Sequence, residues 1–180
     1  SSSGQLGKVY VEIIGCDDLP DLDYSVSGRD KTDAFVCMGF EDCVVNTDVI
    51  NDSLSPRWMP WTQRAFVLNI LHPTSQIMVG VFDHNRTSNL FFEPVHDTVG
   101  RALINVSNCR PGTVYTMKYN LHDIKKRERR VRGSITLRIR VEWKSERLAL
   151  LAATSTVDQH YVSVAKKQFF RTTYYTLSNE

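Results

Sequence analysis

The sequence lacks several features that would assign it to a class of protein at once. No run of about 18 or more apolar residues occurs, so it predicts no membrane-spanning helix. No signal-peptide core opens the chain, and because "SSSGQLGK" also lacks an initiator Met, we expect a fragment of a longer protein. Neither sign of charge is in large excess. The formal net charge of +2 gives no indication of a nucleic-acid partner, and we expect none.

Cysteine is scarce and follows no metal-binding pattern. The four cysteines show no CxxC spacing, which argues against a zinc site. Cys37 and Cys43 fall in apolar, strand-like segments, where a thiol behaves as a small apolar side chain. We therefore expect reduced thiols and a cytoplasmic location. Sequons at Asn51, Asn85 and Asn105 leave glycosylation open if the chain is secreted.

Catalytic motifs are missing as well. The five histidines stand singly, and no nucleophile elbow, phosphate-binding loop or metal-hydrolase spacing accompanies them. His84 and His96 flank a loop, and we expect both to be surface residues. The sequence therefore predicts a domain that is not an enzyme, and leaves open an enzyme elsewhere in a longer parent chain.

What the sequence does contain is alternating hydrophobicity over residues 7–143. The clearest case is residues 133–143, where every second residue from Ile135 to Val141 is apolar and the intervening ones are polar. Eight such segments are separated by turn sequences; they are residues 8–15, 34–40, 43–50, 64–70, 76–83, 98–106, 113–121 and 133–143. With no long helix between them, they predict an all-β fold, an eight-stranded antiparallel β-sandwich.

The character of the sequence changes after Trp143. Residues 145–155 are good helix formers, and residues 158–170 could form a second, weakly amphipathic helix. We therefore predict a sandwich domain over residues 7–143 and a mainly helical tail over residues 144–180. The tail is expected to be a linker to the rest of a larger protein or a contact for a protein partner. A helix lying on a membrane is the alternative.

Acidic residues gather where the predicted strands end. They include four of the aspartates between the first two strands, one that ends the fifth strand and one that precedes the sixth; these are Asp21, Asp23, Asp30, Asp33, Asp83 and Asp97. Carboxylates at neighbouring loops repel one another unless a cation lies among them. Oxygen donors without Cys or His favour calcium or magnesium over zinc. Asx turns that merely terminate strands are the alternative explanation.

Four motifs, in the right order, resemble those of the C2 domain family. The opening strand, acidic loop and "SDPYV"-like strand of that family resemble residues 7–38, "GKVYVEIIGCDDLPDLDYSVSGRDKTDAFVCM". Its "NPxWNE" motif resembles "SPRWMP", and its "LxxxVxDxD…DxxIGxxxI" motif resembles "IMVGVFDHN…HDTVGRALI". The final "GSITLRIRV" strand resembles one that some C2 domains carry at their beginning, which implies the circularly permuted, type II strand order.

The resemblance implies a calcium-binding site. The family's calcium-binding aspartates correspond to Asp23, Asp33, Asp83, Asn85 and Asp97. Asn85 keeps an oxygen donor but removes one negative charge, which generally weakens calcium affinity. The first loop is long enough for Asp21 or Asp30 to substitute for Asp23, and the third loop carries an insertion before Asp97.

Apolar side chains lie beyond the acidic positions in both loops. They are Leu90, Phe91 and Phe92 in the third-loop insertion, and Tyr24 and Val26 in the first loop. An exposed apolar cluster usually marks an interaction site. The C2 resemblance implies that these side chains insert into a membrane; folding back onto the sandwich is the alternative.

A basic run precedes the last strand. Residues 125–132, "KKRERRVR", supply Lys125, Lys126, Arg127, Arg129, Arg130 and Arg132. Such a run can attract anionic lipid, or it can be a solvated connection. Together these features predict a calcium-dependent module that binds anionic phospholipid and targets a parent protein to membranes as a peripheral protein. The alternative is a calcium-independent C2 scaffold that binds a protein or a phosphoinositide.

Overall fold

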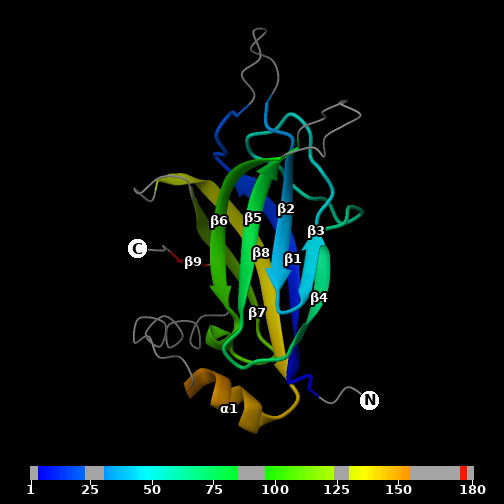
Figure 1. The fold of residues 1–180 in the computed structure, drawn as a ribbon, viewed down its shortest axis with the longest axis vertical. Coiled ribbons are helices and arrows are strands. Elements are labelled where there is room, and N and C mark those ends of the chain that lie inside the picture. The colour runs from blue at the N-terminus through cyan, green and yellow to red at the C-terminus, as the bar shows by residue number, and fades with distance from the viewer. Residues whose placement is uncertain (1–3, 23–30, 85–95, 124–129, 155–174, 178–180) are drawn as a thin grey trace.

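Antiparallel strands form two layers of four that face each other (Figure 1). The computed structural model describes residues 4–22, 31–84, 96–123, 130–154 and 175–177. One layer has the order β3-β2-β5-β6 and the other the order β7-β8-β1-β4. The strands are β1 (Gly7–Asp17), β2 (Ala34–Phe40), β3 (Cys43–Asn46), β4 (Ala65–Ile70), β5 (Gln76–Asp83), β6 (Asp97–Asn105), β7 (Val114–His122) and β8 (Val131–Trp143). The predicted eight-stranded antiparallel sandwich is confirmed.

The two layers are joined at one corner, and β1 and β8 lie next to each other in the middle of one layer. Between β6 and β7 the ladder is a single pair, Arg101 with His122. The last strand, β8, lies between β1 and β7 and pairs antiparallel with both. This is the strand order that the resemblance to type II domains implied.

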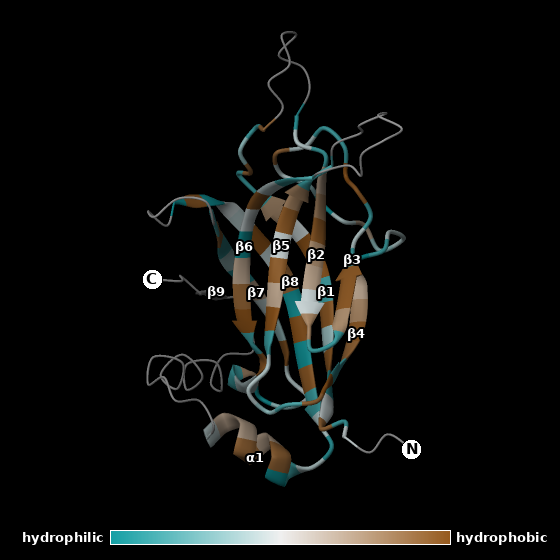
Figure 2. Ribbon diagram, in the orientation of Figure 1, coloured by the Kyte–Doolittle hydropathy of each residue, from teal (hydrophilic) through white to brown (hydrophobic). Residues whose placement is uncertain are grey.

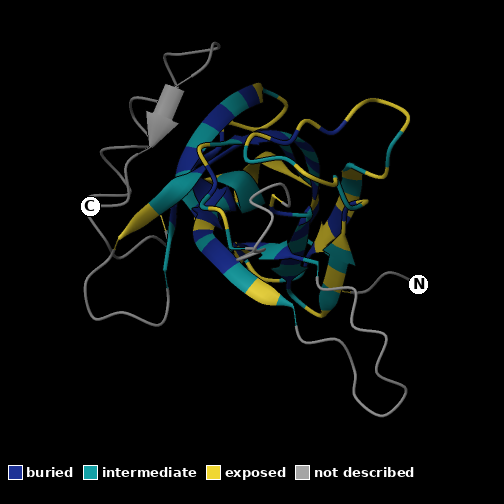
Figure 3. Ribbon diagram, turned by 90° about the horizontal axis from the view of Figure 1, so that it is seen from above, coloured by how far each residue is buried: buried dark blue, intermediate teal, exposed yellow. Residues whose placement is uncertain are grey.

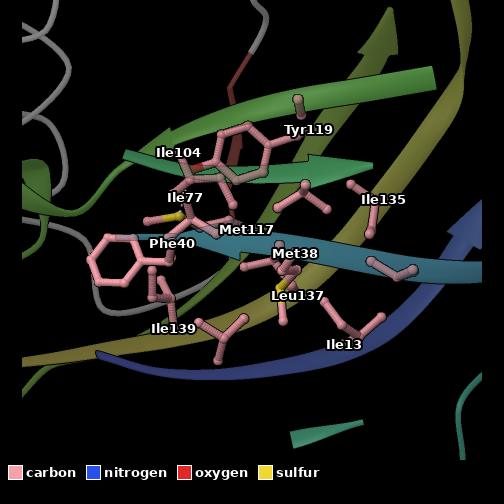
Figure 4. Packing of buried hydrophobic residues seen from close by; sticks show 14 of the residues in the cluster. Ile13, Met38, Phe40, Ile77, Ile104, Met117, Tyr119, Ile135, Leu137 and Ile139 are labelled. Atoms are coloured by element: carbon pink, nitrogen blue, oxygen red, sulfur yellow. Dashed lines mark hydrogen bonds between the residues drawn. The ribbon is translucent and has the colours of Figure 1, made fainter. Parts of the chain in front are cut away.

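In most of the strands, alternate residues are buried between the layers. Along β8, Ile135, Leu137 and Ile139 are at most 1% exposed, whereas Arg138 is exposed. Side chains from both layers meet in this core (Figure 4), and the view along the sandwich shows buried segments around the interior (Figure 3). Bands of hydrophilic and hydrophobic residues alternate along the strands in Figure 2. The alternation of apolar and polar residues in the sequence therefore determines which side chains face the core and which face solvent.

The third strand is shorter than predicted, because side chains interrupt its ladder. It ends at Asn46 rather than at residue 50. The Thr47 hydroxyl accepts a hydrogen bond from the Val36 N–H at 3.0 Å, and the Asp48 carboxylate accepts one from the Gln63 N–H at 2.9 Å. These bonds direct the chain away from β2 into the β3–β4 connection. Further along it, Ile50 forms an isolated bridge with Ala34 of β2.

The tail begins with the predicted helix. Helix α1 spans Glu146–Thr154, lies at the end of the sandwich where β6 ends (Figure 1), and buries Ala152. The second predicted helix, residues 158–170, lies outside the described residues. A short strand that the sequence did not predict, β9 (Tyr175–Leu177), pairs in parallel with β7.

In the described part of the chain, no helix is long and apolar enough to cross a membrane. The division into residues 7–143 and 144–180 stays a prediction.

Glu41 fastens the β2–β3 turn to the connection between β4 and β5. Its carboxylate, only 7% exposed, accepts hydrogen bonds from the N–H groups of Leu71 at 3.0 Å and His72 at 2.8 Å. The Ser75 hydroxyl and the His72 ring also contact it. Burial acts to raise the pKa of Glu41, but these donors outweigh burial and lower the pKa to about 2.

We expect Glu41→Gln to make stability less dependent on pH. The ionised carboxylate stabilises the fold fully above its ordinary pKa of 4.5, and this stabilisation is lost as the pH falls toward about 2. At neutral pH the variant should lose about 2–3 kcal/mol of unfolding free energy, and the difference should vanish near pH 2. Urea denaturation from pH 2 to pH 7 measures this. The exposed neighbour variant Asp42→Asn should show no comparable trend, and a constant difference for Glu41→Gln would contradict the assignment.

Candidate functional site

Two of the predicted calcium-binding residues are joined at one end of the sandwich. The Asp33 N–H donates a hydrogen bond of 2.8 Å to Oδ1 of Asp83, and the His84 N–H donates one of 2.9 Å to the Asp33 carbonyl oxygen. Asp33 immediately precedes β2 and Asp83 ends β5, and these neighbouring strands pair at Ala34 and Asp83. The end of the first loop and the start of the third are therefore held together by backbone.

The Asp33 side chain also holds the connection between β3 and β4. Its Oδ1 accepts a hydrogen bond of 2.9 Å from the Asp52 N–H, in a turn where Asp52 has a φ of 55°. The Ser53 N–H donates to the Thr32 carbonyl at 3.0 Å in the same region. One oxygen of Asp33 thus stabilises a turn 19 residues further along the chain, which is a non-local bond and not the local Asx turn considered from the sequence.

Asp97 lies directly opposite Asp83. The two residues are paired across β5 and β6, with Asp83 only 1% exposed and Asp97 exposed to solvent. Carboxylates at directly opposite positions of an antiparallel pair repel each other, and burial of one strengthens that repulsion. A cation near this pair would relieve it.

The first loop is closed at its base. The Thr32 hydroxyl, on a residue that is fully buried, donates a hydrogen bond of 2.8 Å to the Pro20 carbonyl oxygen. The Leu19 N–H donates to the Leu54 carbonyl at 2.8 Å. Both ends of the loop are therefore fixed next to the Asp33–Asp83 link, at the end of the sandwich opposite α1 (Figure 1).

The rest of the predicted site falls largely outside the described residues. Those positions are the ligands Asp23 and Asn85, the apolar tips Tyr24, Val26, Leu90, Phe91 and Phe92, and the basic residues Lys125, Lys126, Arg127 and Arg129. Within the described ranges, no group of three or more His, Cys, Asp or Glu side chains is arranged to hold a metal ion. The ligand role of Asp33, Asp83 and Asp97 therefore stays a prediction, and the other two predicted ligands, Asp23 and Asn85, lie outside the described residues.

Two basic residues of the predicted run are described, and one of them is in an ion pair. Arg132 Nη2 lies 2.9 Å from Oδ2 of Asp123, whose side chain is 7% exposed. The Arg130 carbonyl accepts a hydrogen bond of 3.2 Å from the Asp123 N–H, and Arg130 itself is exposed. Arg132 thus fixes the start of β8, while Arg130 remains accessible.

Two histidines form a stack that the sequence did not predict. His84 and His96, expected on the surface, are half-buried with ring centroids 4.9 Å apart and an interplanar angle of 27°. Phe35 packs edge-on against His96 at 5.1 Å and stacks on Phe82 at 5.6 Å. The pairing of β5 with β2 on one side and with β6 on the other brings these rings together, so their positions in the sequence alone gave no signal of the cluster.

The thiols are unpaired. All four cysteines are free, Cys16 and Cys109 fully within the core and Cys37 and Cys43 half-buried. Burial raises the pKa of Cys109 to about 12 and also raises the pKa of Cys16. These buried thiols stay protonated and unreactive at neutral pH.

The chain belongs to the C2 domain family. The model of that family matches residues 7–121, well over half of the chain. A search of curated proteins found no match. The matched range ends before β8, although β8 is central to its layer. C2 domains are binding modules and generally not catalytic.

Solved structures support the same fold. A single C2 domain of plant extended synaptotagmin 1 has a TM-score of 0.63 and 17% identity, over 79% of this chain and 98% of that one. The calcium-bound pair of C2 domains of extended synaptotagmin 2 has a TM-score of 0.60 and 18% identity, over 76% of this chain and 46% of that one. Human GIVD cytosolic phospholipase A2 has a TM-score of 0.59 and 14% identity, over 79% of this chain and 17% of that one. At these identities the likeness shows the fold, and the chain spans less than half of the last two.

We expect Asp33→Ala and Asp33→Asn to differ in stability. Alanine removes the acceptor for the Asp52 N–H, whereas asparagine keeps an oxygen in its place. The alanine variant should therefore lose about 1 kcal/mol of unfolding free energy, and the asparagine variant clearly less. Chemical denaturation without calcium measures both. Equal losses would show that the side-chain oxygen does not hold this turn.

Proposed function

We propose that the chain is a calcium-dependent membrane-binding module that targets a larger parent protein to anionic phospholipid. The observation that carries this proposal is the meeting of Asp33, Asp83 and Asp97 at one end of a C2 sandwich. Asp23 and Asn85 would complete an oxygen donor set of the kind that calcium prefers. The four free thiols fit a reducing cytoplasmic location, with the module as a peripheral membrane protein.

Protein donors position the carboxylates before any ion arrives. Asp83 is oriented by the Asp33 N–H, and Asp33 by the Asp52 N–H. A bound calcium ion would supply positive charge at this end of the sandwich and a Lewis-acidic centre for lipid phosphate or carboxylate oxygens. Without it, the acidic residues repel an anionic bilayer; with their charge offset, that repulsion is removed.

Apolar side chains would add to this attraction. Burying a Leu or Phe side chain contributes roughly 1.5–3 kcal/mol before ordering costs. We propose that Leu90, Phe91 and Phe92, together with Tyr24 and Val26, enter the bilayer interface. The basic residues from Lys125 to Arg132 would contact anionic headgroups, each contributing about 1 kcal/mol near the surface.

Calcium uptake tests the metal site directly. Isothermal titration calorimetry should detect calcium binding to the wild-type chain, and Asp97→Asn should weaken it about tenfold or more, because an exposed ligand charge is removed while the fold is kept. The exposed residue Asp42, on the turn between β2 and β3, supplies the control Asp42→Asn, which should bind calcium as the wild type does. Absence of calcium uptake at millimolar concentration would contradict the site.

Membrane insertion is tested separately. The double variant Phe91→Ala/Phe92→Ala should bind phosphatidylserine liposomes more weakly in calcium, while its calcium affinity in solution stays that of the wild type. Liposome sedimentation with and without calcium measures this. Unchanged partitioning would refute insertion. Calcium-independent binding that disappears on neutralising residues 125–132 would favour the basic run as the membrane contact, and no liposome binding at all would favour a protein partner.

A further inference from the structure

The outer face of the β7-β8-β1-β4 layer holds a shallow groove, away from the acidic end. Its volume is about 380 Å³, and its floor is formed by β1 and β8. Directly opposed residues set one row across it: Val67 on β4, Tyr10 on β1, Arg140 on β8 and Val114 on β7. From β4 to β7 this row spans three strand spacings, or about 14 Å.

Cations outnumber carboxylates along this face, because two of the carboxylates are shared. Glu12 pairs with both Arg64 and Arg138, the latter at 3.3 Å. Nearer the acidic end, Asp17 pairs with both Arg57 and Lys118. Burial acts to raise the pKa of Asp17, but hydrogen bonds with these two cations outweigh it and hold that pKa below its usual range.

The third carboxylate has one cationic partner. Glu142 lies 2.8 Å from Arg140 and accepts a hydrogen bond of 3.0 Å from the Tyr10 hydroxyl. The face thus carries five paired cations and three carboxylates. An arginine has five N–H donors, so Arg138 and Arg140, whose side chains are 48% and 38% exposed, keep donors for a further anion.

Apolar groups flank these arginines. Val67 is 57% exposed and Val114 is 50% exposed, one at each side of the groove. The central guanidinium carbon of Arg140 lies over the Tyr10 ring, 4.4 Å from its centre, in a cation–π contact. A ligand for this groove therefore needs negative charge at its centre line and apolar groups beside it.

The outer face of the other layer is different. Its opposed residues form an uncharged row across four strands: Val44, Gly39, Met78 and Leu103. Leaving aside the strand ends, the charged residue among the described outward-facing residues of these four strands is Arg101. The two outer faces of the sandwich are thus chemically distinct, and Arg101 offers a matched control.

We propose that the groove over β1 and β8 binds an acidic amphipathic helix of a partner protein. An α-helix with its side chains is about 10–12 Å wide, which fits between Val67 and Val114. The carboxylates of such a helix would pair with Arg138 and Arg140. Its apolar residues would pack against the two valines and Tyr10, as in helix-in-groove recognition. A planar bilayer does not reach the floor of a groove in the middle of a sheet face. This proposal does not depend on calcium or on the membrane function.

Fluorescence anisotropy with the whole chain tests it, in the absence of calcium. The probe is a labelled synthetic amphipathic helix with glutamates on its polar face and leucines on its apolar face. The comparison peptide has lysines in place of the glutamates. The acidic helix should bind more tightly than the basic one, and Arg138→Gln/Arg140→Gln should weaken it about tenfold or more.

Two further variants separate recognition from folding. Arg101→Gln, on the other face, should bind the acidic helix like the wild type, and Val114→Ser should weaken binding without removing any charge. The unfolding midpoint of each variant verifies that it is folded; if the double variant is not, Arg138→Lys/Arg140→Lys replaces it and should weaken binding through loss of the guanidinium geometry. Equal binding of both peptides, or of wild type and folded variants, overturns the proposal. Loss of phosphatidylserine liposome binding in the arginine variant, with no peptide binding, reassigns the face to lipid.

Discussion

Pairing between β1 and β8, the first and last strands of the sandwich, is the constraint on which the rest of the molecule depends. β1 and β8 are opposed over ten pairs, from Gly7–Trp143 to Asp17–Ser134. On the inner side this register buries Val11 against Ile139. On the outer side the same register sets Tyr10 beside Arg140 and Glu12 beside Arg138. A shift of the β1–β8 register by one residue would exchange the inner and outer sides of the strand. Burial of the apolar residues in the core therefore also determines which residues line the charged groove. The fold and the surface chemistry are therefore products of one register.

The strands were predictable because burial imposes a period of two, and that period can be read from neighbouring residues. The features that the sequence did not predict depend on contacts between segments far apart in the chain. β3 ends early because Thr47 and Asp48 bond to residues of other segments, and propensity carries no information about such partners. The alternating arginines of β8 were visible in the sequence, but their common carboxylate, Glu12, comes from the opposite end of the domain. The stacking of His84 on His96 likewise depends on a cluster assembled by strand pairing.

The sequence predicted the residues of the candidate site, but not how they are brought together. Acidic residues at strand ends were evident from the sequence, and the C2 resemblance selected positions among them. The meeting of Asp33 with Asp83 follows from β2–β5 pairing, which strand propensity does not specify. The sequence offered a structural and a calcium-binding explanation for these carboxylates as alternatives, but at Asp33 a structural role leaves the proposed ligand role possible. One of its oxygens caps a turn, and this bond fixes the direction of the carboxylate. A structural role for a carboxylate is thus no argument against a ligand role.

This double use has a consequence for the electrostatics of the proposed switch. The Asp33 N–H donates to the Asp83 carboxylate and the Asp52 N–H to the Asp33 carboxylate, so part of the negative charge of these two carboxylates is already stabilised by the protein and their mutual repulsion is reduced. The repulsion of an anionic surface then depends more on the solvent-exposed acidic residue, Asp97, and on the residues of the loops themselves. Asn85 lowers that loop charge by one. In the proposed function, an asparagine at this position would therefore weaken both the attraction for calcium and the repulsion of the membrane in the absence of calcium. Under the proposed function, the calcium-free and calcium-bound states would then differ less in charge, and apolar insertion would supply a larger share of the membrane affinity.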